Sequence, residues 1–458
     1  MTGSLGPVMN SRATPSRRDT GVRSGAWSVA LVLLFTACNV PDDSKAPADT
    51  TDTMGNTADS ETAAPVETGD SGRVDVTVTE ETIGDQLLDD SWIFSFDEIH
   101  EINIKLDNDA WNALFNDPYE YVIGEVTVNG DTLSEVGVRL RGKVGSFREL
   151  SGKPKFKIDL NRFIEDQRYW GLETLSLNNS VVDCSFIKET LGYQVFEAAG
   201  VPASRTAYAY VSVNDAPYGL YVWVETPDDR FLKRHFTDPS GNLYDGKYIY
   251  YPNTGAYQLL DFGEGVDHRF GLEEGTETNN AEIREISAQY KASRGRTIYH
   301  EAMSDEINWE ALFRMWLAEQ WVGHNDGYCL NTNNYRVYFD PVTGLGEMIP
   351  WDLDYGFLHD YQWGMNWEYP AGNLAYECFN NAACVFAMRP IAQEFVKTME
   401  SIDWVARVDT LTEFIDTPSH ADPRKECLYT SGVRERARLR NWAEHRTKYL
   451  KAFWNLDE

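Results

Sequence analysis

The sequence predicts an α+β fold, in which a mostly antiparallel sheet with one prominent helix comes first and a largely helical part follows. Between residues 101 and 225, apolar and polar residues alternate in short segments, which is typical of half-buried strands. From about residue 281, apolar residues recur every three or four positions, which indicates helices. With 458 residues, of which 42% are hydrophobic, the chain can bury one large core or two ordinary ones.

The first 38 residues have the composition of an export signal. Arg17, Arg18 and Arg23 precede an apolar run over 26–35, which is too short to span a membrane comfortably. The run ends in LFTAC, which resembles a bacterial lipobox with Phe where Leu is usual, so we expect cleavage to leave Cys38 as a lipidated N-terminus. A plain secretory peptide cleaved near Ala37 is the alternative. Export is predicted either way, and the lipid would hold the protein on the periplasmic or cell-surface side of a membrane.

Residues 39–90 are rich in Asp, Thr, Ser, Ala, Pro and Gly and lack aromatic residues. Such a segment cannot bury enough apolar surface to offset the entropy of ordering, so we predict a disordered tether. Like charges along it should keep it extended.

The chain is strongly acidic, with a formal net charge of −31. A molecule of this charge repels phosphate backbones, so nucleic acid is not expected as a partner, whereas cations and basic peptides are attracted. An acidic surface can also serve solubility alone.

The first half of the folded part reads as strands around one helix. Asn129-Gly130 is a two-residue turn signal, and NDAP at 214–217 marks a second hairpin. Ser185 can cap a helix that runs to about Ala199 and is stopped by GVP. The expected strands are 101–106, 124–142 with its turn, 155–160, 208–213 and 218–225.

The second half reads as helices interrupted by one hairpin. The expected helices are 282–293, 308–322, 389–402 and 434–453. After the second of these, YRVYF and EMIPW read as strands joined by the turn DPVTG. Because a hairpin returns the chain to its start, the aspartates that follow the second strand should lie beside the asparagines that precede the first. These residues are Asp352, Asp354, Asn331, Asn333 and Asn334.

This end of the hairpin predicts a divalent cation site. Several carboxylate and amide oxygens at one place are the ligands that Mg²⁺ or Ca²⁺ prefers. A polar turn network is the alternative, because Asn and Asp are ordinary turn residues. The sequence has neither H-E-x-x-H nor G-x-S-x-G, so metalloprotease and serine-hydrolase chemistry have no anchor.

Five cysteines follow Cys38. Cys378 and Cys384 are near enough along the chain to close a small loop in an exported protein. At least one thiol must stay unpaired, and Cys329 lacks the spacing of a zinc ligand.

The stretch NDGYCLNTNNYRVYFDPVTGLGEMIPWDLDYGF resembles the C-lobe signature of the CotH family, the spore-coat-type kinases with a protein-kinase-like fold. GVRLRG, GKPKFKIDL, IKETLGYQVFEAAGVPASR and YGLYVWVE fit the same family in the same order, so the resemblance covers about 95–357. It implies a two-lobed kinase-like fold, with an N-lobe over 91–230 and a C-lobe over 231–458 that carries the metal-binding hairpin. It also implies phosphoryl transfer from ATP, with Mg²⁺ or alternatively Mn²⁺, to Ser or Thr of exported or cell-surface proteins.

By this resemblance, Asp326 matches the catalytic-loop aspartate, which orients the attacking hydroxyl or accepts its proton. Asn331, five residues later, and Asn334, in the NNY run, are alternative metal ligands, and the choice between them stays open. Asp352 matches the aspartate that bridges the metal and the phosphates, and Asp354 is its second carboxylate.

Two charged residues outside the hairpin complete the implied kinase centre. Alternate residues of a strand share a face, so Lys155 and Lys157 point to one side of strand 155–160 and its apolar residues to the other. Lys157 is the first candidate for the kinase lysine that reaches the phosphates, and Lys155 is the reserve. Solvated lysines on an edge strand are the alternative. On helix 185–199, Glu189 lies in an aromatic stripe and matches the family's helix glutamate, which would pair with that lysine.

The segment LRGKVGSFRELSGK is expected to cover the phosphates. Its glycines permit close backbone approach, and Arg141 and Lys143 supply positive charge. The segment is neither a Walker loop nor G-x-G-x-x-G. Glu225, at the end of YVWVE, falls where the family's strand reaches the hinge between the lobes, and a surface role is its alternative.

Two functions fit these features. The first is a surface-tethered, ATP- and Mg²⁺-dependent kinase that acts on proteins, basic Ser/Thr-rich ones among them. The second keeps the fold without catalysis, as a surface assembly or adhesion lipoprotein whose acidic hairpin end binds Ca²⁺. The presence of the lysine, the helix glutamate and both metal-binding loops favours the enzyme. The sequence predicts no oligomeric state.

Overall fold

The computed structural model describes residues 89–456 except 144, 247–248, 252–255, 259–260, 264–269 and 360–365. The predicted signal peptide with Cys38 and the predicted tether up to residue 88 lie outside the described residues. The described part is α+β, as the sequence predicts. None of its helices is both long enough and apolar enough to cross a membrane.

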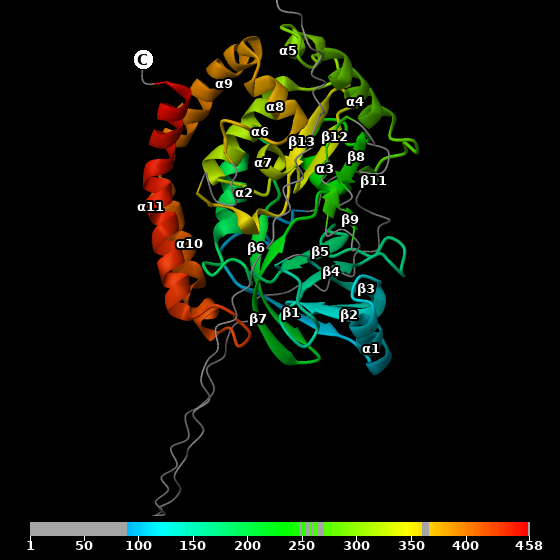
Figure 1. The fold of residues 1–458 in the computed structure, drawn as a ribbon. Helices are drawn as coiled ribbons and strands as arrows, with labels where there is room; N and C mark the ends of the chain where they lie inside the picture. The colour runs from blue at the N-terminus through cyan, green and yellow to red at the C-terminus, as the bar shows by residue number, and fades with distance from the viewer. Residues whose placement is uncertain are drawn as a thin grey trace, which may run out of the picture. The chain divides into compact units, whose positions relative to one another are not determined.

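The strands of the first half form a sheet that closes into a barrel, in the order β1-β2-β3-β4-β5-β7-β6 (Figure 1). Neighbouring strands are antiparallel except β1 and β6, whose parallel pairing completes the barrel. The mostly antiparallel sheet is therefore confirmed, but its closure was not predicted, and a barrel does not by itself establish a kinase-like N-lobe. The strands are β1 (His100–Lys105), β2 (Val122–Val128), β3 (Asp131–Arg141), β4 (Lys155–Asp159), β5 (Thr174–Asn178), β6 (Thr206–Val213) and β7 (Ala216–Val224).

Local sequence signals explain the hairpins and the core of the barrel. Asn129 and Gly130 both have positive φ angles, 51° and 95°, as a two-residue turn that matches the strand twist requires. Asn214 and Asp215 adopt the same region between β6 and β7, with φ angles of 50° and 64°. The apolar side chains of β4, such as Phe156, are fully buried. The alternation seen in the sequence thus separates the barrel core from the face that carries the lysines.

The prominent helix of the first half, α2 (Lys188–Ala198), begins later than the sequence predicts. Ser185 does not cap it, because Phe186 has a φ of 63° and takes the backbone off the helical path. The carboxylate of Asp183 instead accepts the amide N–H of Lys188, at 3.0 Å.

Four strands of the second half form a sheet in the order β11-β8-β12-β13, and β9 pairs with β10 separately. The predicted hairpin is confirmed as β12 and β13, with Tyr335 opposite Pro350 at its open end. The strands are β8 (Asn242–Gly246), β9 (Ile249–Tyr251), β10 (Ala256–Gln258), β11 (Phe270–Glu274), β12 (Tyr335–Phe339) and β13 (Gly346–Pro350).

The four helices predicted from apolar spacing are present as α4, α6, α9 and α11, of which α9 and α11 begin several residues earlier than predicted. α10, which was not predicted, runs alongside α11 (Figure 1). The described helices other than α2 are α1 (Asn108–Asn116), α3 (Asp229–His235), α4 (Ala281–Ser293), α5 (Tyr299–Ala302), α6 (Trp309–Val322), α7 (Tyr328–Asn331), α8 (Asn373–Phe379), α9 (Ala382–Glu400), α10 (Trp404–Ala421) and α11 (Tyr429–Trp454), with a 3₁₀ turn, η3, at Leu353–Tyr355.

Two disulfides are present in the described part of the chain. The predicted Cys378–Cys384 bond is confirmed. A second bond, which was not predicted, joins Cys184, just before α2, to Cys427, between α10 and α11. Cys329 is buried and unpaired, as the cysteine count requires.

Candidate active site

The hairpin brings together the two groups of polar residues that are distant in the sequence. The amide of Trp351 donates to the carbonyl of Asn334 at 2.9 Å, which extends the pairing one step beyond the strands. Asn334 and Asp352 then both turn away with positive φ angles, 50° and 47°, a conformation that Asn and Asp tolerate better than most residues. The side-chain amide of Asn334 donates to the carbonyl of Asp352 at 3.3 Å.

Asp326 lies at the centre of the asparagine group. α6 ends at Gly323, whose φ is 63°, and the chain turns directly into the loop that carries Asp326. The Asp326 carboxylate accepts side-chain N–H groups from Asn331 at 2.5 Å, Asn333 at 3.3 Å and Asn334 at 3.0 Å. Burial raises the pKa of Asp326 to about 6, although these donors act in the opposite direction.

The lysine that reaches the aspartates is Lys155. Its Nζ atom lies 3.0 Å from Oδ1 of Asp352 and 2.8 Å from Oδ2 of Asp354, and its side chain is 1% exposed. Lys157, the first candidate from the sequence, does not make this contact. Burial lowers the pKa of Lys157, and the acidic group that most opposes this shift is Glu273 and not one of the two aspartates. Both lysines leave the same face of β4, so the position of the hairpin along the strand decides between them.

The two aspartates differ in their affinity for protons. Burial acts to raise the pKa of Asp352, but the charges of Lys155 and Arg141 outweigh it and keep the pKa below its ordinary value. Burial, together with the charge of Asp352, raises the pKa of Asp354 to about 6. Burial also opposes the charge on Lys155, but the two aspartates raise its pKa above the ordinary value. At neutral pH Asp352 and Lys155 are therefore charged, and Asp354, whose pKa of about 6 lies below neutral pH, is mostly ionised as well.

Glu189 enters the site from the first turn of α2. Gly192, one turn later, packs so closely on Leu353 that a Cβ there would overlap its side chain, and this contact fixes α2 against η3. Glu189 accepts a hydrogen bond from Asn178 at 2.6 Å, instead of the predicted ion pair with Lys157. Burial and the charge of Asp352 raise the pKa of Glu189 to about 8.

The predicted phosphate loop lies beside η3. Gly145 has a φ of 82°, and a Cβ at this position would collide with the hydroxyl of Tyr355. The guanidinium of Arg141 lies over the ring of Trp351, 5.3 Å from its centroid, which places this charge next to Asp352. Lys143 lies at the exposed surface.

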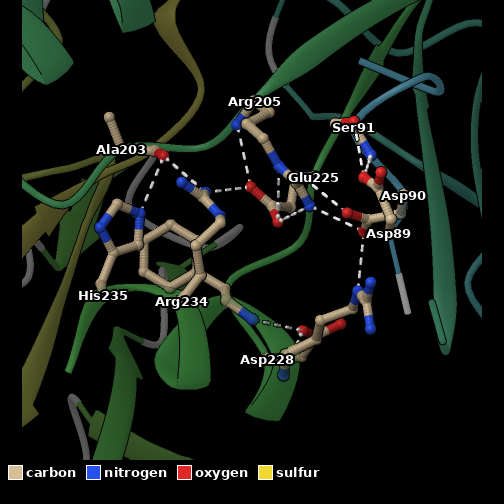
Figure 2. Close-up of polar contacts among 11 residues, drawn as sticks. Asp89, Asp90, Ser91, Ala203, Arg205, Glu225, Asp228, Arg234 and His235 are labelled. Atoms are coloured by element: carbon tan, nitrogen blue, oxygen red, sulfur yellow. Dashed lines mark hydrogen bonds and ion pairs between the residues drawn. The ribbon is translucent and has the colours of Figure 1, made fainter. Parts of the chain in front are cut away.

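Glu225 belongs to a separate ion-pair cluster, which Figure 2 shows. Its buried carboxylate accepts the backbone N–H of Arg205 at 3.0 Å and a guanidinium N–H of the same residue at 2.7 Å, and it pairs with Arg234. Arg205 also pairs with Asp90, which in turn pairs with Arg230. Both carboxylate oxygens of Glu225 are thus bonded to arginines, and Glu225 makes no contact with Asp352 or Asp354. Asp90 belongs to the folded part, although the sequence assigned it to the tether.

Sequence reasoning missed two residues that support the site. Asn178, on β5, holds Glu189. Glu319, on α6, is fully buried and accepts two backbone N–H groups of the Asp326 loop. A lone glutamate in the apolar run of α6 is the signal that could have indicated the second of these.

The side chains of this group offer mainly oxygen atoms, the ligand type that hard cations prefer. In the described part of the chain, no three His, Cys, Asp or Glu side chains are grouped as a metal site. Asparagine side chains instead donate hydrogen bonds to the carboxylate of Asp326, and the Lys155 ammonium contacts the carboxylates of Asp352 and Asp354. None of the described residues donates a hydrogen bond to Oδ1 of Asn331 or Asn334, which leaves two neutral oxygen ligands available.

A family model described as CotH kinase protein matches residues 138–450. The chain is 25% identical over 203 residues to the inner spore coat protein H of Bacillus subtilis (strain 168), and the match covers 42% of this chain and 52% of that protein. The chain thus spans about half the length of this curated relative. Because the family model covers well over half of the sequence, the chain belongs to the CotH kinase protein family.

Proposed function

We propose that this protein transfers the γ-phosphoryl group of ATP to Ser or Thr hydroxyls of exported proteins, with Mg²⁺ as its metal and Mn²⁺ as a possible replacement. The observation that carries the proposal is the position of Lys155, whose ammonium lies between Asp352 and Asp354 next to the Asp326 loop. A lysine, a pair of metal-binding acids and a separate aspartate are the groups that phosphoryl transfer needs for positioning and charge neutralisation. Membership of the CotH kinase protein family supports the same chemistry.

The residues present fit a nucleotide-bound magnesium ion. Asp352 and Asp354 would hold it together with Oδ1 of Asn331 or Asn334, because Mg²⁺ prefers oxygen ligands and few charged ones. When bound, the metal would neutralise charge on the phosphates. The raised pKa of Asp354, caused by burial and by Asp352, supports a site with more carboxylates than its own cations can balance.

The chain's own residues supply the remaining steps. Lys155 would exchange its contacts with the aspartates for contacts with phosphate oxygens. Glu189, 3% exposed and held by Asn178, would then pair with it, and the effect of its charge on the pKa of Lys155 supports this role. Asp326 would accept the proton of the attacking hydroxyl on a carboxylate oxygen, and the asparagine donors hold that carboxylate in one orientation.

The barrel and the helical part would serve as the two lobes of a kinase-like fold, with the 140–153 loop and Arg141 on the phosphate side. We also propose that the protein is exported and held at a membrane by lipid on Cys38, where its net charge of −31 favours basic Ser/Thr-rich protein substrates. The relative named as a spore coat protein supports a location outside the cytoplasm.

The proposal is tested with labelled ATP, Mg²⁺ and a membrane extract. Wild type should incorporate phosphate, Asp352→Asn should not, and Asp340→Asn should behave as wild type. Asp340 is a matched control because it lies at the far end of the same hairpin, where it accepts N–H and O–H bonds within the turn at 3.0 Å each. Equal incorporation by wild type and Asp352→Asn would contradict the proposal. A thermal shift with Ca²⁺ alone and no incorporation would favour the non-catalytic adhesion or assembly function instead.

A further inference from the structure

The loop that carries Asp326 is attached to the buried interior by a carboxylate outside the site itself. Glu319 lies on α6, is 0% exposed, and accepts the amide N–H of Tyr328 on Oε1 at 2.7 Å and that of Cys329 on Oε2 at 2.9 Å. These two amides follow Asp326 after one intervening residue, Gly327, and precede Asn331. Both oxygens of one rigid side chain are therefore bonded to the short segment that separates the proposed base from a proposed metal ligand.

The same carboxylate explains a glycine in the loop. A Cβ at Gly327 would collide with Oε1 of Glu319 and would lie 2.7 Å from the ring of His324. The φ of Gly327 is −86°, so this glycine is needed for space and not for an unusual backbone angle. The carbonyl of Gly327 accepts the amide N–H of Asn331 at 3.0 Å, so a shift at Gly327 would be passed on to the asparagine.

A buried carboxylate in this position has a cost. No Lys, Arg or His in the described ranges lies within ion-pair distance of Glu319, and burial raises its pKa to about 7 in spite of the backbone donors. A buried acid without a cation partner is unfavourable, and an apolar residue would avoid that cost in the surrounding helix. What Glu319 supplies in return is an acceptor for the amides of Tyr328 and Cys329, which lie in the first turn of α7 and have no partner within that helix.

We propose that Glu319 is a positioning residue for phosphoryl transfer, which fixes the Asp326 loop by bonding the amides of Tyr328 and Cys329. The role in transfer rests on the proposed function. The attachment of the loop does not, and it can be measured without any activity.

The attachment is tested through the thiol of Cys329. In the full chain with Cys38→Ser, Cys329 is the only cysteine outside the two disulfides. Its labelling by a thiol reagent in native buffer reports local opening of the loop, once the global stability of each variant is known from denaturant unfolding. Glu319→Gln keeps the shape of the side chain but turns one acceptor into a donor that faces a backbone N–H. Gly327→Ala is a second variant that displaces the same carboxylate without removing it.

The matched control is Gln320→Ala. Gln320 is the next residue of α6 and is 1% exposed, but its Oε1 accepts the indole N–H of Trp454 at 2.8 Å and does not contact the loop. We expect Glu319→Gln and Gly327→Ala to speed labelling by at least about tenfold beyond what the change in global stability explains, which corresponds to ~1.4 kcal/mol. Labelling of Gln320→Ala should follow its global stability. If Glu319→Gln follows its global stability as well, the proposal is overturned.

The consequence for transfer is a separation of kcat from nucleotide binding. Lys155, Asp352 and Asp354 belong to other elements, and Asn331 is the one proposed metal ligand on the segment that Glu319 holds. Glu319→Gln should therefore lower kcat by at least about tenfold, and by more than it raises the ATP·Mg²⁺ concentration at half-maximal thermal shift. A loss of kcat and ATP binding in proportion to the folded fraction would overturn the positioning role. If wild type transfers no phosphate, the proposed function has failed, and the thiol measurement alone then decides whether Glu319 fixes the loop.

Discussion

Replacing Lys155 by Met should reveal the cation site directly. The Lys155 ammonium contacts Asp352 and Asp354 at 3.0 and 2.8 Å, where a divalent cation would have to bind. Met has a similar length and no charge, so the change removes the ammonium and keeps most of the packing. We expect Lys155→Met to be less stable than wild type without metal, and to gain more stability than wild type when Mg²⁺ or Ca²⁺ is added without nucleotide.

The magnitude follows from burial and distance. At ~3 Å and an effective dielectric constant of about 20, each contact is worth about 5 kcal/mol before desolvation is subtracted. Removing one partner of a buried ion pair costs about 3–5 kcal/mol. Asp352 is 24% exposed and can be hydrated, and Asp354 can take up a proton, so the lower end of that range is expected. The apparent Kd for the cation should fall by at least about tenfold, because the ion no longer competes with an ammonium.

The assay is thermal unfolding over a titration of each cation, with Lys157→Met as control. Lys157 leaves the same face of the same strand, so this variant tests position and not merely loss of charge from β4. It should respond to cations as wild type does. An equal response of Lys155→Met and wild type would refute the proposed cation site, and a larger response from Lys157→Met would show that the sequence had favoured the right lysine.

Three further predictions concern stability. Lys153 and Asp422 form an ion pair at 2.6 Å with side chains 1% and 0% exposed, so Asp422→Asn should cost about 3–5 kcal/mol in denaturant unfolding, and a loss under 1 kcal/mol would contradict this. Burial alone would raise the pKa of Glu435, but the neighbouring Arg438 and Lys188 lower it from the ordinary 4.5 to about 2. The ionised Glu435 therefore stabilises the fold above pH 4.5, and this stabilisation is lost as the pH falls from 4.5 to about 2. The gap between Glu435→Gln and wild type in melting temperature should therefore close as the pH is lowered from about 5 to about 2. The disulfide between Cys184 and Cys427, 243 residues apart, should contribute about 5 kcal/mol against about 2 for the short-range one, as double Ser variants would measure.

The part of the site that is local in the sequence could be predicted from it. A strand, a turn of five residues and a second strand determine that Asn334 and Asp352 meet, because hairpin geometry needs no information from elsewhere in the chain. The two faces of strand 155–160 follow from alternation in the same way. The role of Asp326 rests on resemblance, and the structure adds that three asparagines surround it.

The remaining features of the fold and the site depend on contacts between segments that are distant in the sequence. The spacing of apolar residues, with a period of two in strands and 3.6 in helices, does not determine which segments make these contacts. Closure of the barrel needs β1 to pair with β6 in parallel, and no turn signal marks such a pairing. The choice between Lys155 and Lys157 depends on where the hairpin docks along β4. Spacing indicates a disulfide between close cysteines but not between distant ones, so the Cys184–Cys427 bond could not be predicted from the sequence.

Charge balance links the site to its proposed ligand. Fully ionised, the group would hold four carboxylates, and the cations at hand are Lys155 and Arg141, so its charge would be −4 + 2 = −2. The raised pKa values of Asp326, Asp354 and Glu189, each caused mainly by burial, mean that the protein would relieve this excess by holding protons. A divalent cation would relieve it without protons, and its binding should therefore release protons at a pH near 6. We expect addition of Mg²⁺ to release protons from wild type but not from Asp352→Asn. An affinity for Mg²⁺ that does not change with pH would contradict the idea that the excess negative charge of the site drives metal binding.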